Sequence, residues 1–504
     1  MKNQVQLITY IERLSGGGIQ DLRVLLNGPL ANVFGGAHLL PFFTPIDGAD
    51  AGFDPIDHTQ IDPRLGTWDD LRNLGSGLDL MADLIVNHVS SRSPQFLDFS
   101  RNGDKSPYAE MFLTLARVFP NGATEEDLLR VYRPRPGLPV TYTVLTNGQK
   151  RLLWTTFTPQ QIDIDVSSSQ GMDYLNAILS RFHQAGIRAI RLDAAGYAIK
   201  KPGTSCFMIP ETFDFIADLA GKAHALGIEV LVEIHSHYLK QIEIARQVDW
   251  VYDFALPPLI LHALFQADAG PLAAWLSVRP GNAVTVLDTH DGIGVIDVAA
   301  SADAPGLLVP EAIDSLVETI HARSNGQSRQ ATGAAANNLD LYQINCTYFD
   351  ALGGDESAYL LARAVQFFVP GVPQVYYTGL LAGHNDMDLL RQTGVGRDIN
   401  RHYYSDEEIE QALKQDVVTK LIELIRLRNS HPAFLGTSEH RIFDRHMLEI
   451  EWRNGNHWAV LRCDFASVRG QIEYSTNDGK QKALFPIEPG SDANGLASGR
   501  SIPE

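Results

Sequence analysis

The sequence has little cysteine and no long apolar run, and each scarcity excludes a class of protein. Its 504 residues include only three cysteines, Cys206, Cys346 and Cys463, and no Cys-x-x-Cys pair. An odd number of scattered cysteines argues against a disulfide framework and for a reducing compartment. No uninterrupted apolar stretch is long enough to cross a bilayer, and the first residues lack the apolar core of a signal peptide. The sequence therefore predicts a cytoplasmic protein with no membrane partner.

Basic residues are also scarce relative to acidic ones. The chain has 41 lysines and arginines against 60 aspartates and glutamates, which gives a formal net charge of −19. That balance disfavours nucleic acid or an anionic membrane surface as the main partner. It also means that an anionic substrate would need a local cluster of arginines. With 44% hydrophobic and 20% charged residues, the composition is otherwise that of a folded globular protein.

What the sequence has in plenty is short, β-branched apolar segments that end in polar residues. There are eight, at residues 5–10, 37–43, 81–88, 187–193, 228–237, 249–257, 283–292 and 372–379. Near-continuous apolar runs of this length are typical of parallel strands that are covered on both faces. Helical patterns lie between several of them, such as residues 212–227 and 356–369. Eight strands with intervening helices predict an α/β fold, a (β/α)8 TIM barrel.

Two connections are too long for simple crossovers and are loop-rich, and the pattern changes near the C-terminus. The expected barrel parts are residues 1–86, 168–292 and 356–435, with an insertion domain B at 87–167, a second insertion at 293–355 and a C-terminal β domain at 436–504. Insertions after strands project from the carboxyl face of a barrel, where active sites are built. The short alternating segments of the last part predict a small antiparallel sheet. They include a hairpin at 446–463 with Asn454-Gly455 in its turn.

Polar clusters stand at the carboxyl ends of four predicted strands. They are Asn87-His88, Arg191 with Asp193, Glu233, and His290-Asp291. In a barrel these ends converge on one mouth, so three carboxylates would share a pocket with an arginine and two histidines. Two carboxyl groups are what glycoside chemistry requires, one to attack or stabilise the anomeric carbon and one to protonate the leaving oxygen. The third could stabilise the oxocarbenium-like charge and hold sugar hydroxyls.

Each carboxylate taken singly also has an ordinary structural explanation. Asp193 could cap the helix that follows it. Glu233 could be a buried ion-pair partner, and Asp291 could be a turn aspartate. The coincidence of polar groups at four strand ends favours a functional site over these separate explanations. A carbohydrate-binding protein without catalysis is disfavoured, because binding alone needs no nucleophile and acid together.

A metal site is the sharper alternative. The histidines of His235-Ser236-His237 lie at i and i+2, hence on one face if the strand continues, and could join His88, His290 and Asp193 around a zinc ion of a hydrolase. Glu233 would then have no role, and no His-Glu-x-x-His motif supports the metal. No obvious calcium loop is present either. The sequence therefore predicts no metal and no other cofactor.

The motifs that carry these residues resemble a known family. ADLIVNH, IRLDAAGY, EVLVEIHSH and VLDTHDG are similar, in order and spacing, to the four sequence regions of the α-amylase superfamily of glycoside hydrolases. LPFFTPIDGADAGFDPIDHTQIDPRLGTWDDL, FPNGATEEDLLRVYRPRPGLP and TGAAANNLDLYQIN resemble its sucrose phosphorylase branch. The resemblance runs from about residue 3 to about residue 435. It implies conversion of sucrose and inorganic phosphate into α-D-glucose 1-phosphate and fructose, with retention and without a cofactor.

The resemblance also implies a role for individual residues. Asp193 would be the nucleophile, Glu233 the general acid and base, and Asp291 the transition-state stabiliser, with Arg191 keeping Asp193 ionised. The implied glucose-binding residues are Asp50 and Arg397 as a charge pair, Phe53 and Phe157 as apolar walls, and His88, Gln161, Tyr197 and His290. The implied acceptor residues are Arg135 and Tyr342 for phosphate, and Asp340 and Gln343 for fructose. Arg135 lies on a proline-stiffened loop and suits a bidentate phosphate contact, and the small-residue loop 332–340 is expected to rearrange between the half-reactions.

Sibling specificities remain as alternatives at this stage. Related branches act on sucrose 6-phosphate, glucosylglycerol or glucosylglycerate, and a sucrose hydrolase would need the same carboxylates. The stretch 332–343 has no additional basic residue to receive a second phosphate, which favours plain sucrose. Members of the branch often dimerise through the insertion after the third strand, so a homodimer is considered for this chain.

Overall fold

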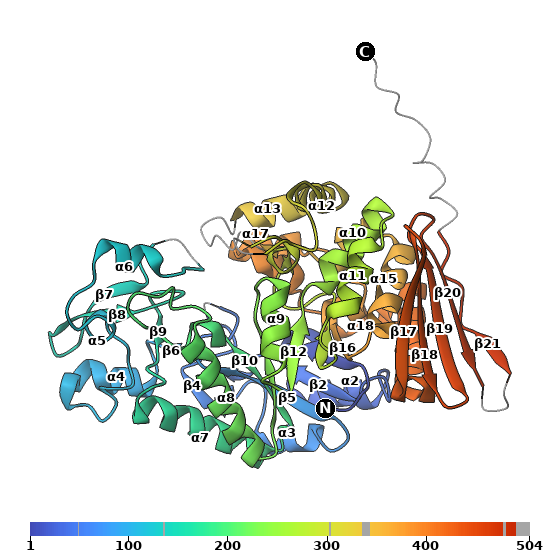
Figure 1. The fold of residues 1–504 in the computed structure, drawn as a ribbon. Coiled ribbons are helices and arrows are strands. Elements are labelled where there is room, and N and C mark those ends of the chain that lie inside the picture. Colours follow the sequence, from blue (N-terminus) through green and yellow to red (C-terminus); the bar gives the residue numbers. More distant parts are fainter. Residues whose placement is uncertain (49, 135–136, 302–303, 335–342, 477–479, 490–504) are drawn as a thin grey trace.

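A closed barrel of eight parallel strands forms the centre of the molecule (Figure 1). The computed structural model describes residues 1–48, 50–134, 137–301, 304–334, 343–476 and 480–489. The barrel strands are β1 (Gln6–Thr9), β2 (Gly36–Leu39), β5 (Asp79–Ile85), β10 (Ala189–Asp193), β11 (Glu229–Val232), β12 (Trp250–Asp253), β13 (Ala283–Thr285) and β16 (Val372–Tyr376). Each predicted segment overlaps one of them, although β2 and β5 begin one and two residues before the predicted segments, and the strands neighbour one another in chain order. The predicted TIM barrel is therefore confirmed.

Helices connect these strands and cover the outside of the barrel. They include α1 (Ile11–Ser15), α2 (Ile19–Asn27), α3 (Trp68–Leu74), α7 (Ser169–Ala185), α8 (Pro210–Ala225), α9 (Tyr238–Ala245), α10 (Leu256–Gln266), α11 (Gly270–Val278) and α15 (Glu356–Phe368). The predicted helices at 212–227 and 356–369 correspond to α8 and α15. Local signals fix their ends. The Asp355 side chain, for example, accepts hydrogen bonds from the backbone amides of Ser357 and Ala358 at the start of α15.

The connection after β5 forms a separate lobe on one side of the barrel (Figure 1). It contains β6 (His88–Ser90) paired with β9 (Gln161–Asp163), β7 (Val140–Val144) paired with β8 (Lys150–Trp154), and the helices α4 (Pro94–Asn102), α5 (Leu115–Val118) and α6 (Glu125–Arg130). A small cluster that includes Phe119 and Trp154 gives it an apolar core of its own. The β6–β9 pair aligns Gln161 with Ser90, and the Gln161 side-chain nitrogen lies 3.1 Å from His88 Nε2.

The connection between β13 and β16 also carries regular elements. It contains β14 (Ile293–Gly294), α12 (Pro310–Arg323), α13 (Gln327–Ala334), β15 (Gln343–Ile344) and α14 (Tyr348–Ala351). The β14–β15 pair brings Gln343 beside the segment that follows Asp291. After β16 come α16 (Tyr377–Leu380), α17 (Met387–Thr393), the 3-10 helix η5 (Gly396–Asn400), α18 (Asp406–Ala412) and α19 (Asp416–Ser430).

A five-stranded antiparallel sheet lies on the opposite side of the barrel from the lobe (Figure 1). Its strands are β17 (Thr437–Asp444), β18 (Met447–Asn454), β19 (His457–Asp464), β20 (Arg469–Ser475) and β21 (Gln481–Ala483). The predicted hairpin is present as β18 and β19, but its loop is Gly455-Asn456 rather than Asn454-Gly455. Asn454 instead pairs with His457 as the last residue of β18. Gly455 has a φ of 59°, as a two-residue hairpin loop with glycine first requires.

The barrel brings the four polar clusters to one end. Asp193 is the last residue of β10, Glu233 follows the end of β11, and His88 begins β6 shortly after β5. His290 and Asp291 follow β13 after a short extended segment. Among the described residues, no helix is both long and apolar enough to span a membrane.

Candidate active site

A cavity opens where these strand ends converge. The predicted site residues that line it are Asp50, Phe53, His88, Phe157, Asp193, Tyr197, Glu233, His290, Asp291, Gln343 and Arg397. Arg191 and Gln161 contact members of this lining without being part of it. Segments that are far apart in the sequence thus build one pocket.

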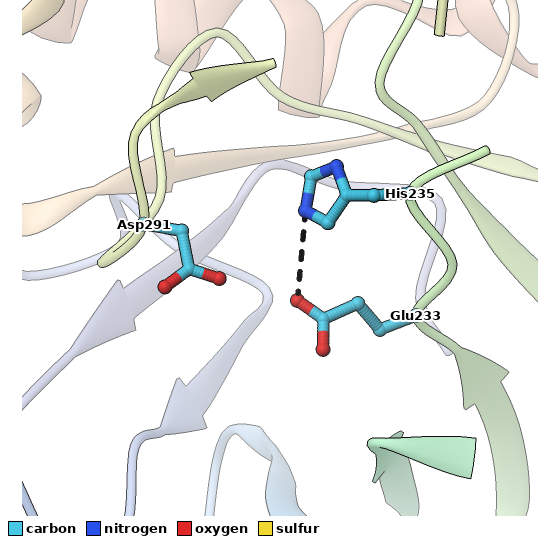
Figure 2. Close-up of side chains that lie close together, drawn as sticks. All are labelled: Glu233, His235 and Asp291. Carbon is cyan, nitrogen blue, oxygen red and sulfur yellow. Dashed lines mark ion pairs between the residues drawn. The ribbon is translucent and has the colours of Figure 1, made fainter. Parts of the chain in front are cut away.

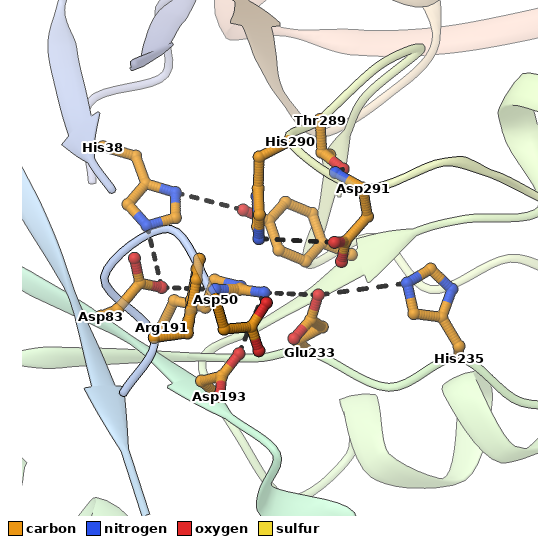
Figure 3. A network of polar contacts seen from close by, with 12 residues as sticks. His38, Asp50, Asp83, Arg191, Asp193, Glu233, His235, Thr289, His290 and Asp291 are labelled. Atoms are coloured by element: carbon orange, nitrogen blue, oxygen red, sulfur yellow. Dashed lines mark hydrogen bonds and ion pairs between the residues drawn. The ribbon is translucent and has the colours of Figure 1, made fainter. Parts of the chain in front are cut away.

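Arg191 holds two of the carboxylates together (Figure 3). One guanidinium nitrogen, NH2, lies 2.5 Å from Glu233 Oε1 and 3.4 Å from Asp193 Oδ1. The other, NH1, donates to Asp83 Oδ1 at 2.5 Å. The arginine side chain is almost fully buried, and the Phe53 ring lies beside its guanidinium carbon at 5.5 Å. A single buried cation therefore contacts three acidic groups, which lie on β5, on β10 and just after β11.

Asp193 does not cap a helix. The next helical turn is the 3-10 helix η2 (Ala195–Tyr197), which is preceded by Ala194 and has no side-chain cap. Burial raises the pKa of Asp193 well above its ordinary value, and Glu233 and Asp83 add to this effect while Arg191 opposes it. A carboxyl group with such a strongly perturbed pKa in a cleft is typical of a catalytic site.

Asp291 lies in a different electrostatic environment. Its Oδ1 is 2.9 Å from Arg397 NH1 and 3.8 Å from Arg401 NH2. Burial favours the protonated form of this carboxyl, but Arg397 and Arg401 outweigh it and lower the pKa of Asp291 below its ordinary value. Asp291 is therefore ionised while Asp193 is pushed towards protonation. Acid and base roles are commonly divided in this way between neighbouring carboxyl groups.

One wall of the pocket, which includes Phe53, His88 and His290, combines buried polar groups with a pair of stacked rings. His88 Nε2 lies 3.0 Å from the backbone oxygen of Phe53, and Gln161 donates to Asp50 Oδ2 at 3.3 Å. The Phe53 ring stacks on His290 with a centroid distance of 4.8 Å. Burial lowers the pKa of both His88 and His290, so both imidazoles are neutral near pH 7. Neutral imidazoles and an amide suit hydroxyl groups rather than a charged ligand.

A second wall of the pocket is aromatic. Tyr197 lies between Phe157, at 5.1 Å, and Phe207, at 4.7 Å, and Tyr132 stacks on Phe207 at 4.5 Å. The backbone amide of Tyr132 also donates to the Ser205 oxygen. These contacts join the lobe to the segment after β10, so the pocket has an apolar wall made from two parts of the chain. Such a wall suits the C–H faces of a sugar ring.

Glu233, His235 and Asp291 are close enough for one metal ion, because their ligand atoms lie within 4.8 Å of one another (Figure 2). The other histidine of the His235-Ser236-His237 pair turns away, and its Nε2 contacts the Pro305 oxygen. A metal ion here would have to share Glu233 with Arg191, and Asp291 with Arg397. The donor set therefore fits an arginine-neutralised carboxylate cluster better than the zinc site that the two histidines suggested.

The family model for the α-amylase catalytic domain matches residues 34–237. A sucrose phosphorylase from Agrobacterium vitis is 62% identical over 476 residues, which cover 94% of this chain and 98% of the relative. The chain belongs to the sucrose phosphorylase family. A second member of this family, the sucrose phosphorylase from Bifidobacterium adolescentis, is 54% identical with 92% of each chain covered. The crystal structure of sucrose 6F-phosphate phosphorylase from Thermoanaerobacter thermosaccharolyticum matches with a TM-score of 0.89 at 37% identity, covering 96% of this chain and 97% of that one.

The residues that are expected to bind the acceptor are described in part. Gln343 lies between Arg397, which donates to its Oε1 at 3.2 Å, and His235, whose Nε2 is 3.3 Å from its Nε2. Arg135, Asp340 and Tyr342 lie outside the described residues, as does most of the loop 332–340. Their expected contacts with phosphate and fructose stay predictions.

Several residues that line the pocket are absent from the predicted substrate-binding set. Tyr132 and Phe207 occur in RVYRPRPGLP and GTSCFM. The proline, glycine and cysteine residues of these stretches are more conspicuous than the single aromatic side chain in each. His235 was considered only as a zinc ligand, yet its Nδ1 faces the buried Asp297 at 3.4 Å, and hydrogen bonding to Asp297 raises the pKa of His235 despite its burial. Its spacing from Glu233, two residues along one strand end, was the available signal.

Proposed function

We propose that the chain catalyses the phosphorolysis of sucrose to α-D-glucose 1-phosphate and fructose, by double displacement with retention at the anomeric carbon. The observation that carries the proposal is the contact of Asp193 and Glu233 with the same nitrogen of Arg191. Carboxyl groups that share one nitrogen are close enough for the separation of about 5–5.5 Å that retaining enzymes use. Relatives that are 62% and 54% identical and carry the name sucrose phosphorylase support the choice of substrate.

In the first half-reaction, Asp193 attacks the anomeric carbon of the glucosyl unit and forms a β-glucosyl ester. The bond from that carbon to the fructosyl oxygen breaks, and Glu233 gives its proton to this oxygen. Asp291, which two arginines keep ionised, faces the same space and stabilises the positive charge that develops on the sugar ring. Asp50 and Arg397, together with the Phe53 and Phe157 rings, line the part of the cavity that receives the single glucosyl unit.

In the second half-reaction, a phosphate oxygen attacks the same carbon from the side that fructose has left. Glu233 takes the phosphate proton, the ester bond to Asp193 breaks, and glucose 1-phosphate leaves with the α configuration. Phosphate must enter a strongly acidic protein, so positive charge near Glu233 is needed. His235 lines the cavity beside Glu233, and Arg135 is the further group that the family resemblance implies. Tyr342 is expected to join it on phosphate, with Asp340 and Gln343 on fructose.

The deciding experiment incubates the protein with sucrose and inorganic phosphate and measures glucose 1-phosphate, free glucose and fructose over time. We expect glucose 1-phosphate and fructose in equal amounts. Free glucose as the main product would instead support a hydrolase. Parallel assays with sucrose 6-phosphate and glucosylglycerol test the sibling specificities, and a higher kcat/KM for either would overturn the choice of sucrose.

The role of Asp193 is tested by Asp193→Asn, with Asp214→Asn on the exposed face of α8 as the matched control. The asparagine variant cannot form the glucosyl ester, so phosphorolysis and hydrolysis should both fall by roughly 10⁴-fold or more. The control should keep its activity. Substantial residual turnover in Asp193→Asn would remove this residue from the role of nucleophile.

We also propose that the protein is a cytoplasmic homodimer. Cys206, Cys346 and Cys463 are buried and unpaired, which suits a reducing compartment. The β7–β8 hairpin of the lobe exposes Tyr142, Val144 and Leu152, and such an apolar group suits a surface covered by a second copy. Light scattering after size exclusion tests the dimer, and Val144→Glu should shift it to monomer. A monomer at micromolar concentration would contradict the proposal.

A further inference from the structure

Beneath the pocket, the barrel interior contains polar side chains, although barrel interiors are usually filled by bulky apolar ones. His38 on β2, Asp83 on β5, Tyr252 on β12 and Gln374 on β16 are all buried, with exposed fractions of 0%, 0%, 3% and 0%. They form one continuous chain of contacts, of which the contact between His38 and Asp83 can be followed in Figure 3. None of the four lines the cavity.

This chain of contacts runs from Gln374 on one side of the barrel to Arg191. The Tyr252 hydroxyl lies 3.2 Å from Gln374 Oε1 and 3.3 Å from His38 Nδ1. His38 Nε2 lies 3.2 Å from Asp83 Oδ1, and the same oxygen accepts from Arg191 NH1 at 2.5 Å. The opposite end of that guanidinium contacts Asp193 and Glu233.

Such a chain is costly to keep. Burial removes the hydration of polar and charged groups, and their hydrogen-bond partners offset only part of the free energy that this costs. A well-packed apolar interior is therefore often as stable or more stable. This chain of contacts ends at Arg191, the cation that Asp193 and Glu233 both contact. A polar interior that converges on this cation is explained by control of its position rather than by stability.

We propose that His38 and Tyr252 are positioning residues for glucosyl transfer, which act through Asp83 to hold the Arg191 guanidinium against Asp193 and Glu233. The inference rests on the proposed function of the site. His38 Nε2–H donates to the same Asp83 oxygen that accepts from Arg191. The Tyr252 hydroxyl fixes the imidazole through Nδ1. Without His38, Asp83 would draw the guanidinium towards itself and away from Asp193.

The test compares three variants with one control. His38→Met fills a similar volume but cannot donate to Asp83, whereas His38→Gln can present an amide N–H near the position of Nε2. Tyr252→Phe removes a single oxygen. His262→Met replaces a buried histidine of α10 that lies outside this chain and is the matched control.

For His38→Met, we expect kcat for sucrose phosphorolysis to fall roughly 10- to 100-fold, the range for losing a hydrogen bond to a charged group, while KM for sucrose changes less than about 3-fold. Tyr252→Phe should fall less, and His38→Gln should recover most of the rate. His262→Met should match the wild type. In an Asp83→Asn background, His38→Met should cause little further loss, because its effect passes through Asp83.

The pH profile gives a readout that a merely structural role would not move. Asp193 is faced by Arg191 from its own strand, by Glu233 and Asp83 from the neighbouring strands, and by Asp291. With Arg191 drawn towards Asp83, the ionised form of Asp193 is less stabilised, so the acid limb of kcat should move to higher pH in His38→Met and Tyr252→Phe. His38→Gln should restore the limb.

The outcomes separate this inference from the proposed function. Wild-type protein that transfers no glucose from sucrose would overturn the proposed function and this inference with it. An active wild type, with kcat and the acid limb unchanged in both His38→Met and Tyr252→Phe, would overturn the inference alone. If His38→Met does not fold, as judged by circular dichroism and thermal unfolding, Tyr252→Phe decides by itself.

Discussion

Lys200 is the residue whose loss should most clearly separate the lobe from the barrel. Its side chain is only 1% exposed, and its ammonium group lies 2.5 Å from Asp163 Oδ2, 2.6 Å from Asn87 Oδ1 and 2.6 Å from the Tyr197 oxygen. These three acceptors belong to β9, to the segment between β5 and β6, and to η2. One buried cation thus joins the lobe to two barrel loops that carry pocket residues.

The expected cost of Lys200→Met follows from these contacts. Breaking a buried ion pair by removing one partner costs about 3–5 kcal/mol. The lower end applies here, because Asp163 keeps the hydrogen bonds from the Thr156 amide and hydroxyl. An unfolding entropy of about 2.1 cal/mol/K per residue gives about 1 kcal/mol/K for 504 residues, so Tm should fall by about 3–4 °C. The KM for sucrose should rise as well, since His88 and Tyr197 lose their support.

Differential scanning calorimetry and sucrose kinetics measure both effects. The neighbouring Lys201 is a matched control, because it pairs with Glu211 on the surface and Lys201→Met should change the stability by less than about 1 kcal/mol. The double variant Lys200→Met/Asp163→Asn should recover part of the loss, since it no longer buries an unpaired carboxylate. A Tm within about 1 °C of the wild type for Lys200→Met would refute the argument.

Three further outcomes are expected. Arg397→Lys keeps the charge but cannot contact Asp291 and Gln343 together, so kcat/KM for sucrose should fall at least roughly 10-fold, and an unchanged value would contradict the pocket geometry. The hydrogen bond to Asp350 raises the pKa of His384, so this histidine stabilises the fold fully below its unfolded pKa and loses that effect as pH rises through its folded pKa. The Tm difference between wild type and His384→Gln should therefore be larger at about pH 5.5 than at about pH 9, and equal differences would argue against it. Prolonged dialysis against EDTA should leave the rate unchanged, whereas a loss that zinc or calcium restores would support a metal at Glu233.

The barrel could be predicted because strands buried on both faces leave a continuous apolar signal. The ends of those segments were less predictable. The apolar pattern at 283–292 extends well past β13, which ends at Thr285, because the following residues stay buried on their way to the pocket. The hairpin loop was misplaced by one residue for a different reason. Asn454-Gly455 and Gly455-Asn456 are both acceptable two-residue turns, and only the pairing of the flanking strands decides between them.

The pocket residues could be predicted where they stand at strand ends or in family motifs, but their partners could not. Asp83 and His38 lie inside apolar segments, and nothing local shows that one side chain reaches Arg191 and the other reaches Asp83. Lys200 follows a short helical turn and has the sequence context of a surface lysine. Its partners Asp163 and Asn87 are 37 and 113 positions away in the sequence, so only the folded structure reveals these contacts. Long-range polar contacts of this kind leave no periodic signal.

The sharing of Arg191 has a consequence for the proposed reaction. Arg191 is closer to Glu233 than to Asp193, and burial together with the neighbouring acidic groups raises the pKa of Asp193 and so favours its protonated form. The reaction requires the opposite arrangement, with Asp193 ionised and the proton on Glu233. When Glu233 turns to the leaving oxygen of a bound substrate, it would lose its contact with Arg191, and the guanidinium would then stabilise the ionised form of Asp193 more strongly. Asp83, which His38 contacts, would hold the other end of the guanidinium in place, so that Arg191 does not move with Glu233. In the proposed reaction, Asp193 would thus become ionised as Glu233 moves to the leaving oxygen, and one buried arginine would couple the two events.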